Sequence, residues 1–394
     1  MKTFVSTLCV TSALALSACV GDSHGSAAAP VATPTSTPTP APTPAPAPVS
    51  YTIGGTVTGL SSGTLTLQDH GGQTLDITAN GAFTFGTAAN PGDSYFVTVK
   101  TQPGTLNCQV SAPNGSNVAA NVTTVNVSCA AAQVTQIAPL TSFDNVSSMA
   151  VDNQNNVYVV GVIGATPGYV YKVTPGATSG TPLVPGTSLP GLTGVAVDSQ
   201  GNVYIAGPLS YVAQIAPGAT SPTPITTGTT YAYSDGLGID SSDNLYLTDH
   251  GANKIYKIQA GANITTEAPI EVGAIAGPIS VAVDNSNNLY VPTGLTGGLA
   301  RFVPGVTTPT IVPATASLSQ IYSTAVDHND TLFISTFTTN GCKLYKVVAG
   351  APAPSAISSG TTTLGNVCSI QVDSSGNLYV GDYMYGKVYK IVNP

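Results

Sequence analysis

Six aspartates recur at nearly constant spacing in the second half of the chain, and each follows a short apolar run. They are Asp152, Asp198, Asp240, Asp284, Asp327 and Asp373, with spacings of 46, 42, 44, 43 and 46 residues. Carboxylates could bind calcium, and the runs DHND at 327–330 and DSSD at 240–243 have part of the required acid spacing. Both lack the alternating acids, the central glycine and the closing glutamate of a calcium loop. We therefore expect these aspartates to accept hydrogen bonds from backbone amides in tight turns.

Other residue types that could catalyse a reaction are few in this part of the chain. Residues 132–394 contain two histidines and two glutamates. His328 lies in one of the aspartate turns, so only His250, beside Asp249 and with Asp382 expected nearby, could join a site for a metal or for proton transfer. The sequence has no motif for a serine or cysteine nucleophile and no glycine-rich phosphate loop. We therefore expect no catalytic residue, no cofactor and no bound metal.

Each aspartate belongs to a repeat that predicts four β-strands. An apolar strand, a polar turn and a second apolar strand come first, as in VAVDSQGNVYIA at 195–206. A third strand with a basic residue follows, as in KIYKIQAGA at 254–262, and a short edge strand ends the repeat. Strands that are apolar on both faces must be covered on both sides. A period in the low forties suits four-stranded blades, so residues 132–394 are predicted to form an all-β, six-bladed β-propeller.

The repeats resemble the NHL-repeat family of propellers. The nearest copy is NLYLTDHGANKIYKI at 244–258, which has the family's order of strand, aspartate, asparagine and basic strand. The resemblance implies the fold and no particular activity, because propellers host unrelated functions. Two features depart from the family. The glycine before the turn asparagine is present only at Gly201 and Gly376, and the arginine of the third strand is mostly lysine here.

The two ends of the repeat region predict how the ring is closed. The last repeat reaches Pro394 directly after its third strand and has no fourth strand. A further strand pattern at 133–140 precedes the first repeat. We expect residues 133–140 to supply the missing strand of the last blade, which would leave no open sheet edge.

Loops at one face of the predicted propeller are candidates for binding. The loops after the second and fourth strands of the blades lie where the central channel opens, and concave openings with aromatic and acidic groups bind small molecules or peptides. The candidate binding residues are Tyr231, Tyr233, Asp249, His250, Tyr322, Asp382, Tyr383 and Tyr385. Phe143, Asp144, Asp235 and Phe337 belong to the same loops. Because loop tyrosines also pack between blades, a purely structural role for them stays open.

The N-terminus has the pattern of an export signal. Lys2 precedes an apolar run of small residues at 3–16, and the sequence LSAC then ends at Cys19. This resembles the lipobox of bacterial lipoproteins, which implies that residues 1–19 are a signal peptide and that Cys19 is lipidated. An ordinary secretory signal cleaved nearby is the alternative. Val20 stands where family members of the inner membrane have aspartate, which implies an outer-membrane lipoprotein, either periplasmic or surface-exposed.

Two segments separate the signal from the repeats. Residues 20–50 form a linker with almost no apolar bulk. Residues 30–48 within it consist largely of Pro, Thr and Ala, which predicts an extended, polyproline-like stalk with a reach of about 60 Å. Residues 51–131 alternate short strand patterns with turns, as expected for a β-sandwich. The runs YTIGG, LTLQ and NGAFTF resemble an immunoglobulin-like module of bacterial surface lipoproteins.

The cysteines predict two disulfides. They are Cys9, Cys19, Cys108, Cys129, Cys342 and Cys368. Cys108 and Cys129 lie on the last two strands of the predicted sandwich and should pair in an exported protein. If Cys9 is removed with the signal peptide and Cys19 is lipidated, as the lipobox resemblance implies, then Cys342 and Cys368 form the second pair.

The charge composition argues against a role in nucleic-acid binding. Only 7% of residues are charged, compared with roughly 25% in a typical soluble domain. The net charge is −8 with ten basic residues, so no basic surface exists to neutralise phosphates. We therefore expect a monomeric, lipid-anchored cell-envelope protein that is not an enzyme and binds a protein, peptide or glycan. The alternatives are a hydrolase or lyase acting on a small metabolite at the central channel, and a structural subunit of an envelope array.

Overall fold

The computed structural model describes residues 49–394 apart from 70, 138–143, 163–167, 226–229, 262–269, 295–296, 366–367 and 393. The stalk and signal peptide expected at 1–48, and Phe143 of the loop set, lie outside the described residues. The described residues after 48 form one compact unit. Apart from the short 3-10 turn η2 (Pro313–Thr315), the described elements are strands. None of the described helical segments is long and apolar enough to cross a membrane.

The first part of this unit consists of two four-stranded sheets that share one apolar core. One sheet has the order β4-β1-β8-β6 and the other β3-β2-β5-β7. The core includes Val57, Leu65, Leu67 and Val127, each at most 1% exposed. The strands are β1 (Ile53–Thr58), β2 (Leu65–Asp69), β3 (Thr74–Ile77), β4 (Gly81–Thr84), β5 (Tyr95–Thr101), β6 (Leu106–Ser111), β7 (Asn114–Gly115) and β8 (Val122–Ala131). The two sheets therefore pack face to face as a sandwich.

Six further four-stranded sheets follow along the chain, and all their strand pairs are antiparallel. We number them sheets 1 to 6. The first three comprise β10 (Asn145–Val151), β11 (Val157–Val162), β12 (Gly168–Val173) and β13 (Thr181–Pro182); β14 (Gly194–Val197), β15 (Val203–Gly207), β16 (Tyr211–Ile215) and β17 (Thr223–Pro224); and β18 (Ser234–Ile239), β19 (Leu245–Asp249), β20 (Lys254–Ile258) and β21 (Ile270–Ala274).

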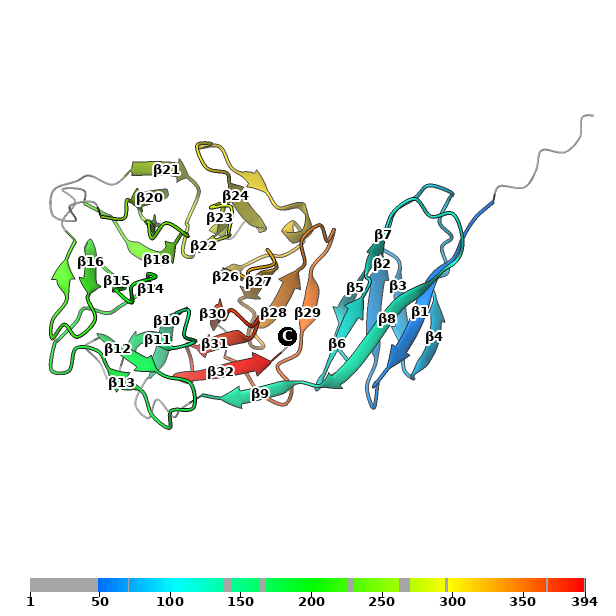
Figure 1. Cartoon of the computed structure of the whole chain (residues 1–394), viewed down its shortest axis with the longest axis horizontal. Helices are drawn as coiled ribbons and strands as arrows, with labels where there is room; N and C mark the ends of the chain where they lie inside the picture. The colour runs from blue at the N-terminus through cyan, green and yellow to red at the C-terminus, as the bar shows by residue number, and fades with distance from the viewer. Residues whose placement is uncertain are drawn as a thin grey trace, which may run out of the picture. The chain divides into compact units, whose positions relative to one another are not determined.

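The other three sheets repeat the same order. Sheet 4 comprises β22 (Ala282–Val283), β23 (Leu289–Pro292), β24 (Leu299–Phe302) and β25 (Thr310–Ile311); sheet 5 comprises β26 (Ile321–Val326), β27 (Leu332–Thr336), β28 (Lys343–Val347) and β29 (Ser355–Ile357); sheet 6 comprises β30 (Cys368–Val372), β31 (Leu378–Asp382), β32 (Lys387–Val392) and β9 (Gln133–Gln136). Figure 1 shows the sheets around a common centre, with the first strand of each sheet innermost. Each innermost strand contacts the innermost strands of both neighbouring sheets, and β10 contacts β30.

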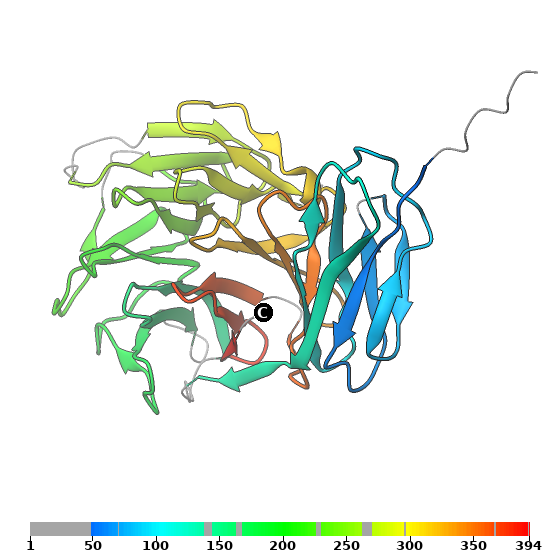
Figure 2. The ribbon, with the colours of Figure 1, turned by 45° about the vertical axis from the view of Figure 1, so that its right-hand side comes forward.

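Strand β9 joins the start of this region to its last sheet. It pairs with β32 in antiparallel register, for example Val134 with Ile391, and the Ile137 amide donates to the Val388 carbonyl at 3.0 Å. Figures 1 and 2 both show β9 beside β32. Of the segment 133–140 expected to form this strand, the structure describes residues 133–137. Their pairing gives β32 an outer neighbour, so that sheet 6 has four strands like the others.

Contacts between the two parts of the unit involve the outer strand of sheet 5. The Gln102 side chain donates to the Ala356 carbonyl at 2.9 Å, and the Ser358 hydroxyl donates to the Gly104 carbonyl at 2.8 Å. The Ser358 amide also donates to the Asn107 side chain at 3.2 Å. Polar groups of the sandwich thus satisfy part of an outer strand that would otherwise be an exposed edge. Nothing in the sequence pattern pointed to this contact.

The repeated aspartates shape the turns between the first and second strands, as predicted. In sheet 3 the Asp240 carboxylate accepts from the amides of Ser242 and Asn244, both at 2.9 Å, and from the Tyr246 hydroxyl at 3.1 Å. The other five aspartates also accept from two backbone amides of their own turns. Because these hydrogen bonds use the carboxylate oxygens, the aspartates act as turn formers.

The fourth residue of each turn, counted from the aspartate, has positive φ, which explains why the NHL pattern has glycine there. Glycine fills this position at Gly201 and Gly376, with φ of 82° and 78°. Asparagine or aspartate fills it in the other four turns: Asn155, Asp243, Asn287 and Asp330, with φ of 58–62°. Asn and Asp tolerate the left-handed region better than other side chains, so the turn keeps its shape without glycine.

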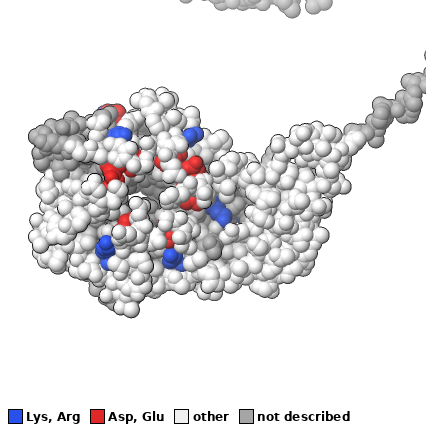
Figure 3. All heavy atoms as spheres, viewed as in Figure 1, with Lys and Arg blue, Asp and Glu red and all other residues white. Residues whose placement is uncertain are grey.

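Some of these turn side chains also connect neighbouring sheets. The amide and hydroxyl of Ser199 in sheet 2 donate to Asp243 of sheet 3 at 2.9 and 2.6 Å. Ser374 of sheet 6 and Asn155 of sheet 1 form the same contact at 3.4 Å. Ser241 contacts Asn287 at 3.2 Å, and Asn285 contacts the His328 carbonyl at 2.9 Å. Figure 3 shows one face of the molecule, on which acidic and basic side chains gather over these sheets.

Both predicted disulfides are present. Cys108 and Cys129 are directly opposite each other on β6 and β8. Cys342, just before β28 of sheet 5, is bonded to Cys368 at the start of β30 in sheet 6. The second disulfide therefore ties two neighbouring sheets together.

We expect the disulfide between sheets 5 and 6 to stabilise the protein by about 3 kcal/mol, because it closes a loop with a sequence separation of 26 residues. Replacing Cys342 and Cys368 by Ala should lower the free energy of unfolding by that amount in urea titrations. Reducing agent should then have a smaller effect on the variant than on the parent protein. An unchanged unfolding midpoint would contradict this role.

Candidate functional site

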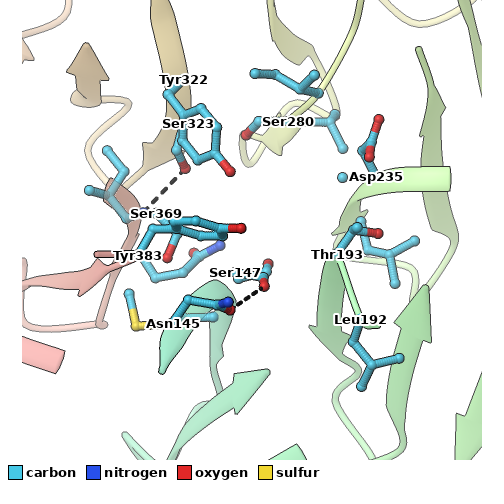
Figure 4. A pocket seen from close by; sticks show the side chains of 18 of the residues that line it. Asn145, Ser147, Leu192, Thr193, Asp235, Ser280, Tyr322, Ser323, Ser369 and Tyr383 are labelled. Atoms are coloured by element: carbon cyan, nitrogen blue, oxygen red, sulfur yellow. Dashed lines mark hydrogen bonds between the residues drawn. The ribbon is translucent and has the colours of Figure 1, made fainter. Parts of the chain in front are cut away.

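A cavity of about 510 Å³ lies at the centre of the six sheets, and the innermost strands supply most of its lining. Figure 4 shows its side chains converging from opposite sides: Tyr322, Ser323, Ser369 and Tyr383 on one side, Leu192, Thr193 and Asp235 on the other. Sheets on all sides of the ring contribute to it. The cavity is therefore the mouth of the central channel, where the sequence predicted binding.

A recurring small residue makes room for this cavity. Four positions before each turn aspartate the sequence has Ser148, Gly194, Gly236, Ser280, Ser323 and Ser369. At Gly236 a Cβ atom would come within 2.7 Å of the Ser280 Cα of the next sheet. At Gly236 the innermost strands of sheets 3 and 4 therefore approach too closely for any side chain. This pattern is visible in the sequence.

The lining is rich in hydroxyl groups and poor in charge. Eight hydroxyl side chains line it: Ser147, Ser148, Thr193, Ser280, Tyr322, Ser323, Ser369 and Tyr383. Two amides, Asn145 and Gln371, and one carboxylate, Asp235, complete the polar groups. Among the described lining residues there is no Lys, Arg or His. Such a surface can donate and accept many hydrogen bonds but offers no cation to an anionic ligand.

His250 pairs with the one carboxylate of the lining. It follows β19, and its Nδ1 atom contacts a carboxylate oxygen of Asp235 in β18. The Tyr233 ring lies 4.9 Å from the imidazole, centroid to centroid. Burial raises the pKa of Asp235, although the hydrogen bond and charge of His250 oppose that shift. The pair thus fixes an imidazole beside the cavity mouth.

Two tyrosines contribute both ring faces and hydroxyls to the cavity. Burial raises the pKa of Tyr322 to about 12, and the nearby Tyr383 and Asp235 add to this shift. The Tyr322 hydroxyl therefore stays protonated at neutral pH and can donate a hydrogen bond. Tyr383 lies in the loop after β31 and is 42% exposed, so its ring is accessible from solvent.

Two of the predicted acidic residues hold loops instead of facing the cavity. The Asp249 carboxylate accepts from the amides of Ala232 and Tyr233, both at 2.8 Å. The Asp382 carboxylate accepts from the amides of Gly365 at 2.7 Å and Met384 at 2.9 Å. Both aspartates are fully buried. Their hydrogen bonds to backbone amides give them a structural role at the ends of β19 and β31.

The predicted tyrosines divide between core and surface. Tyr231 is 2% exposed and packs against Tyr256, with ring centroids 5.3 Å apart. Tyr233 and Tyr385 are about half exposed, at 50% and 51%. Tyr322 and Tyr383 line the cavity.

Asp144 and Phe337 are described but do not line it. No group of three metal-ligating side chains occurs among the described residues.

No known family model matches the sequence, and no curated protein matches it either. Solved structures do resemble it. A structural genomics protein of unknown function from Bacteroides thetaiotaomicron aligns with a TM-score of 0.53 and 13% identity, over 83% of this chain and 90% of that one. The Xanthomonas campestris protein XC5397, described as a gluconolactonase, aligns with a TM-score of 0.53 and 11% identity, over 67% of this chain and 90% of that one. The fold is of the propeller type. At these identities the likeness shows the fold alone.

Proposed function

We propose that the protein is a lipid-anchored cell-envelope protein whose six-bladed, NHL-type propeller binds an uncharged, hydroxyl-rich molecule, such as the end of a glycan, at its channel mouth. A stalk and an immunoglobulin-like sandwich would hold the propeller away from the membrane. The observation that carries the proposal is the lining itself, with eight hydroxyls, two amides and one carboxylate.

The chemistry of the lining favours a neutral polyol over an anion or an apolar ligand. Buried hydroxyls and amides gain most from a ligand that pairs with them, and they lose hydrogen bonds when an apolar group displaces water. Tyrosine rings such as those of Tyr322 and Tyr383 can also stack on the apolar face of a sugar. Among the described lining residues no Lys, Arg or His offers a positive charge to an anion.

We expect filling the cavity to abolish binding. In Ser280→Leu and Ser323→Leu the added methyl groups would occupy the space between the innermost strands and remove hydroxyls. The probes are neutral mono- and disaccharides and an uncharged tetrapeptide, titrated into residues 49–394 by calorimetry. Ser375→Leu, in an exposed turn, is the control. Loss of saccharide binding in both cavity variants but not in the control supports the proposal. A parent protein that binds only the peptide, or binds none of the probes, overturns it.

Membrane anchoring through Cys19 has its own test. The supporting observation is the sequence LSAC after the apolar run at 3–16. We expect Cys19→Ser to move the protein from the membrane fraction to the soluble envelope fraction and to abolish labelling by a fatty-acid analogue. Cys9→Ser, within the signal peptide, should stay membrane-bound. A Cys19→Ser protein that still fractionates with outer membranes would contradict lipidation at this residue.

A hydrolase or lyase is the second candidate, and the His250–Asp235 pair beside the cavity is the observation that favours it. A carboxylate that orients an imidazole is a common arrangement for general base catalysis. The similar Xanthomonas campestris protein is described as a gluconolactonase, so sugar lactones are the first substrates to assay. Turnover that disappears in His250→Ala would favour the enzyme, whereas binding without turnover would favour the binding protein.

A further inference from the structure

A second cavity, separate from the channel mouth, lies between sheets 1 and 2. Its volume is about 710 Å³, and its lining comes from the turns and third strands of these two sheets, including Gly201 and Lys172. This junction differs from most others in the ring. The turn contacts described above connect sheets 2 and 3, 3 and 4, 4 and 5, and 6 and 1.

The junctions without such a turn contact are those of sheets 1 and 2 and of sheets 5 and 6. In both, the fourth residue of the turn in the second sheet, counted from its aspartate, is glycine. In three of these contacts the partner is the residue of positive φ in the following sheet: Asn155, Asp243 or Asn287. Sheet 2 has Gly201 and sheet 6 has Gly376 at that position. Without a side chain there, neither the junction of sheets 1 and 2 nor that of sheets 5 and 6 can form this contact.

At the junction of sheets 5 and 6, another part of the chain lies between the two sheets. Pro394, two residues after β32 of sheet 6, is buried, and the Lys346 ammonium of sheet 5 donates to its main-chain oxygen. Figure 1 shows the end of the chain beside β28 and β32. Pro394 thus occupies this junction, with a lysine on its main-chain oxygen.

Sheet 1 has a lysine, Lys172, at the position equivalent to Lys346, and it lines the cavity between sheets 1 and 2. Lys172 is opposite Tyr158 in the register of β11 and β12, as Lys346 is opposite Phe333 in sheet 5. The Lys172 ammonium lies 5.2 Å from the Tyr158 ring centroid. Lys257 of sheet 3 instead binds its turn aspartate, Asp240, at 3.3 Å. Among the described residues Lys172 has no hydrogen bond or ion pair of this kind, so it is available to a ligand.

The walls of this second cavity suit an extended peptide. Prolines and small apolar side chains form them, among them Pro182, Leu183, Pro185, Ala216 and Pro217. The polar side chains at its edge, such as Gln154 and Gln200, can pair with a peptide backbone. We propose that the groove between sheets 1 and 2 binds an extended, proline-containing peptide segment of a partner protein, with a peptide carbonyl oxygen on Lys172. The chain's own Pro394 is the internal precedent for this mode.

The test uses residues 49–394 and a fluorescent peptide with the sequence IVNP, taken from residues 391–394, followed by fluorescence anisotropy. Lys172→Met should weaken binding at least about tenfold, because a charge-assisted hydrogen bond is lost, while Lys172→Arg should retain it. Gly201→Asn should also abolish binding, since asparagine adopts this turn at Asn155 and Asn287 and would place a side chain in the groove.

Two controls separate this site from the channel mouth and from general damage. Ser280→Leu should leave peptide binding unchanged, and the peptide IVNA should bind more weakly than IVNP. Thermal unfolding checks that each variant is folded. Equal binding to the parent, Lys172→Met and Gly201→Asn proteins would overturn the proposal, as would no binding of IVNP at millimolar concentration.

Discussion

Replacing residues 133–137 by a Gly-Ser segment of the same length is expected to destabilise the propeller by about 4–6 kcal/mol. The replacement removes the side chains of Val134 and Ile137, which pack against the apolar clusters of the last and first sheets. It also weakens the pairing of β9 with β32 and leaves β32 as an exposed edge. The loss should therefore affect the whole ring and not one sheet.

The measurement is urea unfolding followed by tyrosine fluorescence and circular dichroism in parallel. The two curves should coincide for the parent and separate for the variant, because an unclosed ring can open sheet by sheet. The control replaces Thr310–Ile311 (β25), a two-residue exposed outer strand, by Gly-Ser. This control should change the stability by less than about 1 kcal/mol. A replaced 133–137 segment that unfolds like the parent would refute closure by β9.

Asp240→Ala is expected to cost about 3–5 kcal/mol. Asp240 is 5% exposed and accepts hydrogen bonds from two turn amides, the Asn244 side chain, Tyr246 and Lys257. Alanine would leave these donors, of which the Tyr246 hydroxyl is buried, without their acceptor. Asp327 provides a matched comparison, because its turn has Thr331 and Phe333 in place of the asparagine and tyrosine.

Asp327→Ala should cost less, about 1–2 kcal/mol, since two backbone amides are the main donors to that carboxylate. Urea titration of both variants under identical conditions measures the difference. Equal losses would mean that the tyrosine and asparagine of the network add nothing to the turn.

The same network predicts a loss of stability in acid. Burial by itself would raise the pKa of Asp240 and Asp373, but hydrogen bonds from their asparagines, turn amides and lysines outweigh it and lower both pKa values. A carboxyl group with a lower pKa in the folded state stabilises the protein above its unfolded pKa of about 3.9. That stability should be lost as the pH falls through the lower folded value. In Asp240→Ala the acid-dependent part of the loss should be smaller, and an identical pH profile would contradict this.

The sequence predicted the repeat and its turns because both depend on local chemistry. The spacing of the six aspartates marks the sheets, and each carboxylate binds amides within four residues of itself. Cys342 and Cys368 could be paired once the lipobox resemblance had set Cys9 and Cys19 aside. The candidate site was predicted only in part. Tyr322 and Tyr383 line the cavity, but Asp249 and Asp382 were chosen for their charge, and only the backbone path reveals that they hold loops.

Other features required distances across the ring. The serines of the cavity, such as Ser280 and Ser369, look like ordinary strand residues until six innermost strands come together. The groove between sheets 1 and 2 depends on the absence of a side chain at Gly201. In the sequence alone, a glycine at this place in the turn says nothing about the neighbouring sheet. The contact of the sandwich with Ser358 joins residues about 250 positions apart, and no periodicity predicts it.

The most direct test of the account uses the few methionines of the chain. The sequence has three, and residues 49–394 contain only Met149, which lines the cavity, and Met384, which is 53% exposed beside Tyr383. With methyl-labelled methionine, NMR spectra should show two resonances. We expect neutral disaccharides to shift the Met149 resonance saturably, and sugar acids of the same size to leave it unchanged. A Met149 resonance that ignores every neutral sugar, or that responds equally to the acids, would contradict binding at the channel mouth.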